Sequence, residues 1–159
     1  MKSDEVLVNI RKIVRGINLE NKRIQKQFGI SIPQLLCLSF LKEQPNYSAN
    51  HKQIKDYLNL NASTVTGIIF RLSQKEFVTK QPSENDRRVV AVKLSAKGLK
   101  LFNDAPELLH SKLEEKLNSL SSEKLLQLKS ALDYLIDIMD LQEIEASPLI
   151  TSSEPIQPE

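Results

Sequence analysis

The chain has 159 residues, which is enough for one domain with a full hydrophobic core. Its formal net charge of +2 conceals an asymmetry: residues 1–49 carry eight basic and four acidic side chains, residues 50–100 carry ten and four, and residues 101–159 carry four and twelve. The single cysteine excludes an internal disulfide and a cysteine-cluster zinc site, and the basic middle third is the charge pattern expected of a nucleic-acid-binding surface.

The sequence also argues against secretion and against a membrane-spanning segment. The N-terminal Met-Lys-Ser-Asp-Glu lacks the apolar core of a signal peptide. No run approaches the roughly 18 apolar residues that a membrane-spanning helix needs. We therefore expect a cytoplasmic protein that makes no contact with a membrane.

A long helix is predicted over residues 4–28, where apolar side chains recur at three- and four-residue spacing and Gly29 ends the pattern. The polar Asn21 interrupts this stripe and would fix the register of a helix pair. The stripe consists of Leu7, Ile10, Val14, Ile17, Ile24 and Phe28. Such a stripe is buried either in the core of the same chain or against a second copy.

The next helix is predicted to begin at Ser31 and contains the only cysteine, Cys37. Leu35, Leu36 and Leu38 surround Cys37, and in such an apolar setting a cysteine is usually a small core residue. The alternative is an oxidant sensor, which would need a reactive thiolate.

Two short helices with a tight connection are predicted over residues 50–75. Asn50 and Gln53 have the spacing of a capping box at the start of the first helix, and Asn61 can cap the second. The apolar sides consist of Ile54, Tyr57 and Leu58 in the first helix and Val65, Ile68, Ile69 and Leu72 in the second. This arrangement is typical of a helix-turn-helix.

The opposite face of the second helix is predicted to be exposed. At about 100° per residue it carries Ser63, Gly67, Phe70 and Gln74, flanked by Thr64, Thr66 and Arg71. Small hydroxyls, a glycine and a guanidinium suit close approach to base edges and phosphates. The alternative for the hydroxyls is helix capping on a solvated face.

Beyond Glu76 the period changes from helical to strand-like, which predicts a hairpin over residues 77–94. Its polar middle, residues 83–88, contains Asp86, Arg87 and Arg88. The two arginines would reach a phosphate or a narrow minor groove, and Asp86 would orient one of them by a charge-assisted hydrogen bond. A solvated hairpin tip is the plainer alternative.

The order of these features resembles the MarR type of winged helix-turn-helix transcriptional regulators. The resemblance covers roughly residues 4–142 and depends on a combination of short segments, not on any one of them. These segments are 29–34 (Gly-Ile-Ser-Ile-Pro-Gln), 58–66 (Leu-Asn-Leu-Asn-Ala-Ser-Thr-Val-Thr), 71–72 (Arg-Leu), 86–88 (Asp-Arg-Arg) and 94–98 (Leu-Ser-Ala-Lys-Gly). The fold that it implies is mostly α-helical with a small β-hairpin wing.

The resemblance implies an obligate homodimer that places one recognition helix in the major groove and one wing arginine in the minor groove from each protomer. Carried over by position, the helix contacts are Ser63, Thr64, Thr66, Gly67 and Arg71, and the wing contacts are Asp86, Arg87 and Arg88. Arg88 is the stronger candidate for the groove.

Two positions depart from the pattern of this family. Gly67 stands where a long polar or basic side chain is common, and Phe70 where an acidic or polar one is. Phe70 would touch a thymine methyl or cover its own subdomain. The sequence therefore predicts a sequence-specific DNA-binding regulator, a ligand-responsive repressor in the usual case of this family; the alternative is a winged-helix protein-interaction module with weak or no specific DNA binding.

A second apolar stripe lies near the C-terminus. Together with the resemblance to the MarR type, it leads us to expect that both ends of the fold form the dimer contact. The stripe consists of Leu125, Leu128, Leu132, Leu135 and Met139. We expect one domain over residues 1–145, with dimerisation helices at 4–28 and 100–142, a winged helix-turn-helix at 31–98, and a disordered tail at 146–159. Ordinary core within one protomer is the alternative for these leucines.

A small-molecule effector is expected where the first two helices meet the winged subdomain. The expected lining is residues 13–17, residues 34–41 and Tyr47, which suits an aromatic or amphiphilic ligand. No metal site and no cofactor are expected, since His51 and His110 are the only histidines and would lie at exposed helix ends. The sequence has no nucleotide-binding loop, nucleophile elbow or zinc motif, so we do not expect an enzyme.

Overall fold

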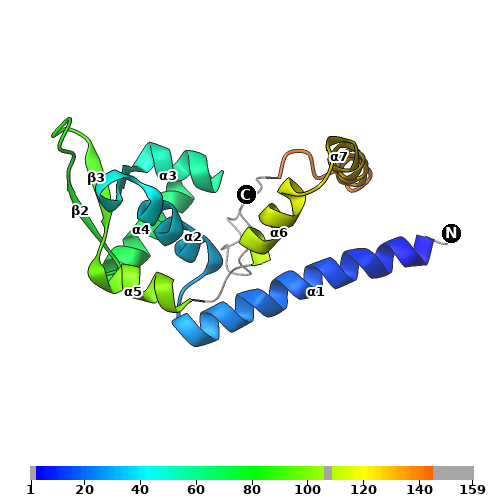
Figure 1. Cartoon of the computed structure of the whole chain (residues 1–159), viewed down its shortest axis with the longest axis horizontal. Coiled ribbons are helices and arrows are strands. Elements are labelled where there is room, and N and C mark those ends of the chain that lie inside the picture. Colours follow the sequence, from blue (N-terminus) through cyan, green and yellow to red (C-terminus); the bar gives the residue numbers. More distant parts are fainter. Residues whose placement is uncertain (1–2, 106–108, 145–159) are drawn as a thin grey trace. The chain divides into compact units, whose positions relative to one another are not determined.

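The computed structural model describes residues 3–105 and 109–144, which form two compact units (Figure 1). The first unit contains helices α1 (Ser3–Phe28), α2 (Ile32–Glu43), α3 (His51–Leu58), α4 (Ala62–Gln74) and α5 (Ala96–Asp104), the 3₁₀ turn η1 (Pro45–Tyr47), and strands β1 (Ser48–Asn50), β2 (Val78–Pro82) and β3 (Val90–Leu94). The second contains α6 (Leu109–Asn118) and α7 (Ser122–Ile138). The predicted fold class, mostly helical with a small hairpin, is confirmed.

Local backbone geometry and capping explain where α1 ends and where α2 begins. Gly29 has a φ of 65°, a left-handed conformation that glycine adopts without strain, and it ends α1. Ser31 then caps α2: its hydroxyl accepts the amide of Gln34, whose side-chain oxygen accepts the amide of Ser31. Lys75, the C-cap of α4, donates to the carbonyl of Gly29 and so ties the end of α4 to this turn.

Helices α3 and α4 form the predicted helix-turn-helix. The capping box of Asn50 and Gln53 is present, with both hydrogen bonds at 2.9 Å, and the left-handed Asn59 (φ 52°) ends α3. Asn61 caps α4 by accepting the amide of Thr64 at 2.8 Å. The predicted inner stripe of α4 is buried as expected: Val65, Ile68, Ile69 and Leu72.

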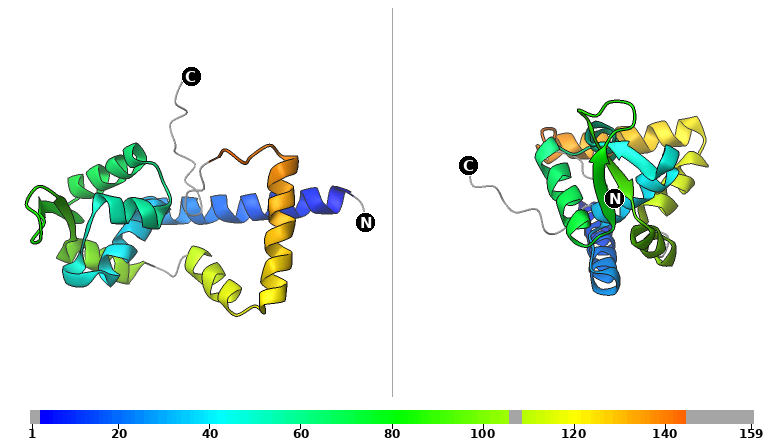
Figure 2. Two further views of the ribbon diagram at one scale, coloured as in Figure 1. Left: turned by 90° about the horizontal axis from the view of Figure 1, so that it is seen from above. Right: turned by 90° about the vertical axis from the view of Figure 1, so that its left-hand side faces the viewer.

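Three antiparallel strands follow the order β1-β3-β2, and the hairpin β2–β3 projects beyond the helices as a wing (Figure 2). Within the hairpin Thr79 pairs with Lys93, and on the other side of β3 Ala49 pairs with Val92. The sequence predicted the hairpin but not β1. That strand has only three residues and runs directly into the cap of α3, so it is too short to show an alternating pattern.

The Leu-Ser-Ala-Lys-Gly segment locks α5 to the start of the wing. The Ser95 hydroxyl accepts the amide of Gly98 at 3.0 Å and donates to the carbonyl of Glu76 at 2.7 Å. A Cβ at Gly98 would lie 2.2 Å from the carbonyl oxygen of Phe77, so only glycine allows this approach. Helix α5 also packs against α2. The winged helix-turn-helix was expected to end at residue 98, and this position lies inside α5.

The core of the first unit is built mainly on α2. Leu35, Leu36, Leu38 and Leu41 are fully buried, and Cys37 lies among them without exposed surface. Tyr57, expected on the apolar side of α3, is exposed on one side and stacks on Phe40 at a centroid distance of 4.5 Å.

The second unit consists of α6 and α7, and Ser121 caps α7 by accepting the amide of Lys124. The expected tail at 146–159 lies outside the described residues. Across the part of the chain that is described, no helix is long and apolar enough to cross a bilayer.

Candidate nucleic-acid interface

Helix α4 presents an exposed face opposite its buried stripe. Ser63, Thr66, Phe70 and Arg71 are exposed, and Thr64 and Gly67 are half-buried. Phe70 has 54% of its surface exposed, so more than half of the residue is accessible to a partner. The face therefore combines hydroxyls, an aromatic ring and a guanidinium, as the sequence predicted.

The hydroxyls of this face are engaged with their own helix. The Oδ1 atom of Asn61 accepts from the Ser63 hydroxyl at 2.8 Å as well as from the amide of Thr64. The Thr66 hydroxyl donates to the carbonyl of Ala62 at 2.9 Å and lies 3.0 Å from Nε2 of His51. Capping and base contact are therefore not exclusive alternatives for this segment, since each hydroxyl oxygen has two lone pairs.

Gly67 provides room for Arg71 on the same face. A Cβ built at Gly67 would lie 3.6 Å from one terminal nitrogen of Arg71 and 3.9 Å from its central guanidinium carbon. The guanidinium thus lies over Gly67, one turn from its own backbone. The glycine that departs from the family pattern leaves the face flat at this point and brings the charge of Arg71 over it.

The wing tip holds one of its two arginines in place. Oδ1 of Asp86 accepts from the amide of Arg88 at 3.0 Å and from its Nε at 3.2 Å, and Oδ2 accepts from Nη2 at 3.3 Å. These bonds, the side-chain pair first and the backbone bond second, hold the pKa of Asp86 below its ordinary value. The predicted orienting bond is present, and its partner is Arg88.

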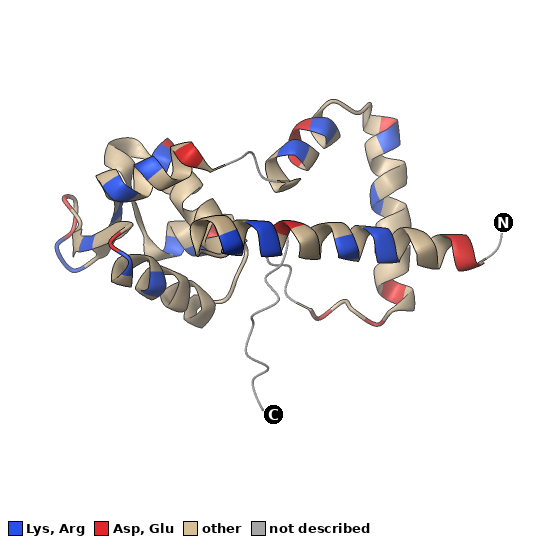
Figure 3. Ribbon diagram, turned by 90° about the horizontal axis from the view of Figure 1, so that it is seen from below, with Lys and Arg blue, Asp and Glu red and all other residues tan. Residues whose placement is uncertain are grey.

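Both arginines of the wing are available to a partner. The Arg88 side chain is 91% exposed despite its bonds to Asp86, and Arg87 is also exposed. The tip is closed by backbone bonds from Val89 to Asp86 and from Ser83 to Val89. Figure 3 shows basic positions at the hairpin tip and along α1.

His51 is the residue of this surface that the sequence reasoning missed. It is the first residue of α3, as expected, but it is half-buried and bonded to Thr66. The two residues are fifteen positions apart, and no spacing rule connects the start of one helix to the middle of the next. Only the packing of the two helices brings them together.

The candidate dimerisation residues lie on apolar surfaces. On α1, Leu7 and Val14 are exposed and Ile10 and Ile17 are half-buried. On α7 and at its C-cap, Met139, the predicted positions Leu128, Leu132 and Met139 are exposed and Leu135 is half-buried. Helix α7 exposes further large apolar side chains that the stripe did not include: Leu126, Tyr134, Ile136 and Ile138.

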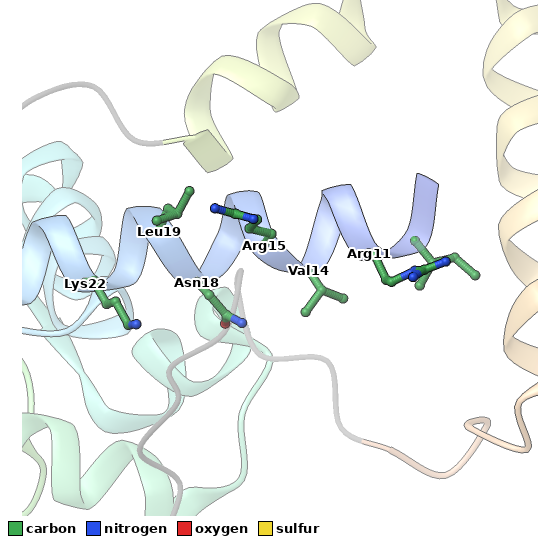
Figure 4. Close-up of a pocket in the computed structure, with 7 residues that line it drawn as sticks. Arg11, Val14, Arg15, Asn18, Leu19 and Lys22 are labelled. Atoms are coloured by element: carbon green, nitrogen blue, oxygen red, sulfur yellow. The ribbon is translucent and has the colours of Figure 1, made fainter. Parts of the chain in front are cut away.

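A surface hollow of about 480 Å³ lies along α1 (Figure 4). The described residues that line it are Ile10, Arg11, Val14, Arg15, Asn18, Leu19 and Lys22. It includes two residues of the expected effector lining at 13–17, and none of its described residues comes from 34–41. Leu35, Leu36 and Leu38 lie in the closed core instead, while Ile13 and Tyr47 are exposed.

No group of three or more potential metal ligands occurs in residues 3–105 and 109–144. His110, the second residue of α6, lies 4.0 Å from Glu114 on the same helix.

Comparison with known proteins identifies the family. Residues 30–90 match the model of the MarR family. The organic hydroperoxide resistance transcriptional regulator of Bacillus subtilis is 30% identical over 125 residues, which cover 79% of this chain and 82% of that protein. The transcriptional repressor MprA of Escherichia coli K12 is 25% identical over 126 residues, covering 79% and 72%.

A solved structure has the same fold. Sco3205, a MarR family transcriptional regulator from Streptomyces coelicolor in complex with DNA, superposes with a TM-score of 0.60 at 18% identity, covering 93% of this chain and 96% of that one. The matched relatives are transcriptional regulators, not enzymes. Because the Bacillus relative matches over most of both chains and the family model matches the helix-turn-helix, this chain belongs to the MarR family of DNA-binding transcriptional regulators.

Proposed function

We propose that the chain acts in the cytoplasm as a homodimeric repressor that binds a pseudo-palindromic operator and releases it when a small effector binds. The observation that supports this most directly is the wing tip, where Asp86 orients an almost fully exposed Arg88 in the same unit as the exposed face of α4. Each protomer would place α4 in the major groove and Arg88 in the adjacent minor groove of one half-site.

The proposed DNA contacts divide by chemistry. On α4 they are Ser63, Thr64, Thr66, Gly67, Phe70 and Arg71, and on the wing Asp86, Arg87 and Arg88. Arg71 offers several donors to a guanine edge or a phosphate. Arg87, which lacks the bonds that hold Arg88, suits a phosphate, where position matters less than charge. Asp86 acts by orienting Arg88.

Dimerisation is supported by the apolar surface of the terminal helices. Helix α7 is apolar on more than one side: Leu126 is 65% exposed and Tyr134 is 69% exposed, in addition to the predicted stripe. Exposed apolar surface of this extent normally marks an interaction site. We assign these side chains, with the exposed apolar residues of α1, to the contact between two copies.

The effector is proposed for the hollow on α1, where Ile10 and Val14 would also belong to the contact between copies. It combines three apolar side chains, Ile10, Val14 and Leu19, with the cations Arg11, Arg15 and Lys22. Such a lining suits an amphiphile with an anionic group, such as an aromatic acid.

Repression is the sign of regulation that the name of the Escherichia coli relative gives for that protein.

DNA binding is tested by titrating the full-length protein against the DNA upstream of its own coding sequence and against a scrambled duplex of the same composition. Measurements at about 50 and 200 mM salt separate specific from electrostatic affinity. We expect the upstream duplex to bind on the order of 10³-fold more tightly at the higher salt. Equal affinities would favour the alternative, a protein-interaction module. The exposed ring of Phe70 would then contact a protein partner.

The effector is tested by reciprocity. Small aromatic acids and lipophilic compounds that raise the unfolding temperature are added to the operator titration. A ligand that weakens DNA binding must itself bind the DNA complex more weakly by the same factor. If every such compound leaves the operator affinity unchanged, the protein is not regulated by this class of ligand.

A further inference from the structure

The hydrogen bonds of Thr66 determine which part of its side chain is available to a partner. A threonine hydroxyl has one hydrogen and two lone pairs. The hydrogen is donated to the carbonyl of Ala62 at 2.9 Å. Nε2 of His51 lies 3.0 Å from the same oxygen, and because the hydroxyl hydrogen is given to Ala62, we assign Nε2 as the donor of this bond. The hydroxyl is thus bonded twice within the protein and keeps one lone pair, while the methyl of this exposed side chain is engaged by neither bond.

Phe70 lies on the same face, one turn after Thr66. Residues four apart on a helix are neighbours, so the methyl of Thr66 and the ring of Phe70 form an apolar strip. The core does not need this strip, because α4 already buries Val65, Ile68 and Leu72 on its other side. With more than half of its surface exposed, the ring of Phe70 is free to meet an apolar group of a partner.

Ser63 differs from this strip in what it offers. Its hydroxyl donates to Oδ1 of Asn61 at 2.8 Å, so its oxygen is left as an acceptor for a partner. Arg71 supplies only donors. Ser63 and Arg71 are therefore the main hydrogen-bonding groups that this face offers, and Thr66 and Phe70 are its apolar groups.

We propose that Thr66 and Phe70 read the 5-methyl groups of thymine, so that the operator requires thymine at the base steps these two residues meet. The thymine methyl is the apolar group that a base pair displays in the major groove, and threonine methyls and phenylalanine rings are suitable partners for it. This inference rests on the proposed function, in which α4 enters the major groove. His51 is a positioning residue here, because it holds the Thr66 hydroxyl away from the bases.

The effect expected from one methyl is small but measurable. Burying one methyl group stabilises a complex by roughly 0.8 kcal/mol, which corresponds to a change in affinity of about fourfold. If each half-site of a dimer contains one such thymine, replacing both changes the affinity by about the square of that factor, on the order of fifteenfold.

The experiment begins with a duplex selected by the full-length protein from a random-sequence pool. Each thymine of the selected duplex is then replaced by deoxyuridine, which removes the methyl and leaves every hydrogen-bonding group in place. We expect at least one thymine per half-site whose replacement weakens binding about fourfold, and no effect at thymines outside the site.

Two substitutions at position 66 separate the methyl from the hydroxyl. Thr66→Ser keeps the bonds to Ala62 and His51 and removes the methyl, so at the thymine that Thr66 meets it should bind the thymine and deoxyuridine duplexes equally. Thr66→Val removes the hydroxyl and keeps the methyl, so it should still distinguish them. Phe70→Leu, which stays apolar, should retain discrimination that Phe70→Ala loses. Unfolding temperature and affinity for a random duplex serve as controls for each variant.

The outcomes separate this inference from the proposed function. A selection that yields no preferred sequence would overturn both. A preferred sequence that is indifferent to deoxyuridine would leave the regulator intact and refute the methyl contact. Discrimination that survives in Thr66→Ser but is lost in Thr66→Val would show that the hydroxyl reads the base, and the assignment would also be wrong.

Discussion

The Asp86–Arg88 pair shows how two neighbouring side chains prepare an exposed contact. A free arginine loses up to about 2 kcal/mol of rotamer freedom when it is fixed. Here Asp86 holds both the backbone amide and the guanidinium of Arg88 before any partner arrives. Part of the ordering is therefore complete in the free protein, which improves binding without adding a contact.

Replacing the two wing arginines in turn should distinguish groove from phosphate contact. Arg88→Ala is expected to weaken operator binding by about 1–3 kcal/mol per protomer, because a held guanidinium in a narrow minor groove is lost. Arg87→Ala should lower the affinity for operator and random duplex alike, since a phosphate contact carries no sequence information. Fluorescence titrations at matched salt measure both. Equal operator affinity for the wild type and Arg88→Ala would refute the groove assignment.

Asp86→Asn is the control for orientation. The amide oxygen can still accept the backbone amide of Arg88, but the charge that attracts the guanidinium is gone. Operator affinity should fall less than for Arg88→Ala, while the unfolding temperature stays unchanged.

Cys37 should behave as an inert core residue. Burial raises the pKa of its thiol from 9.0 to about 12, so the thiolate that oxidants attack is scarce at neutral pH. A thiol reagent should label Cys37 only after unfolding in denaturant, and peroxide should leave DNA binding unchanged. Rapid labelling of the native protein would restore the redox hypothesis.

The same shift predicts how stability depends on pH. Above pH 9 the unfolded chain loses the thiol proton while the folded chain keeps it until about pH 12. The unfolded state is therefore increasingly favoured across this window, and the stability present below pH 9 is lost as the pH rises. The difference in unfolding free energy between the wild type and Cys37→Ala should shrink between pH 9 and 11. A constant difference would contradict the raised pKa.

At the scale of elements, the junction of α5 with the wing depends on one close contact. Gly98→Ala would place a Cβ against the backbone carbonyl of Phe77, which cannot move without disturbing the start of β2. We expect a loss of about 1–3 kcal/mol in the free energy of unfolding, measured by denaturant titration.

Gly16→Ala is the matched control for that substitution. Gly16 lies within α1, and a Cβ there meets nothing within 4 Å. Alanine should therefore stabilise the helix by about 0.5–1 kcal/mol. If both variants lost stability equally, the close approach at Gly98 would not be the cause.

The elements that the sequence predicted are those with strong local signals. The caps at Ser31, Asn50 and Asn61 and the stop at Gly29 set helix ends through interactions three or four residues apart, and all are found. The orienting bond in the wing spans two residues. The contact between His51 and Thr66 and the pairing of β1 with β3 could not be predicted, because each depends on how separate elements pack.

For the expected effector lining, the periodicity of the sequence was likewise insufficient. The leucines of α2 were expected beside a ligand, but periodicity cannot tell a residue that lines a hollow from one in a closed core. The structure places Leu35, Leu36 and Leu38 in the core, and one hollow of the described residues lies along α1.

At the scale of the whole molecule, DNA reading and dimerisation are assigned to different helices. The basic excess belongs to residues 1–100, whereas residues 101–159, which include α7, carry four basic and twelve acidic side chains. Helix α7 itself carries two basic and three acidic side chains, so it offers DNA no basic surface, and a dimer contact built from α7 would not compete with the operator for the same face.

The isolated chain is therefore expected to be a dimer of about 36 kDa, twice the 18.1 kDa of one copy. Leu132→Glu would put a charge among the apolar side chains of α7 and should give a monomer at micromolar concentration, because an unpaired charge in a contact costs several kcal/mol. Leu132→Met keeps this position apolar at a similar volume and should leave the dimer intact. Light scattering measures the mass, and the operator titration shows whether affinity is lost together with the dimer. A wild-type monomer that binds the operator tightly would contradict the assembly, and a Leu132→Glu dimer would place the contact elsewhere on the chain.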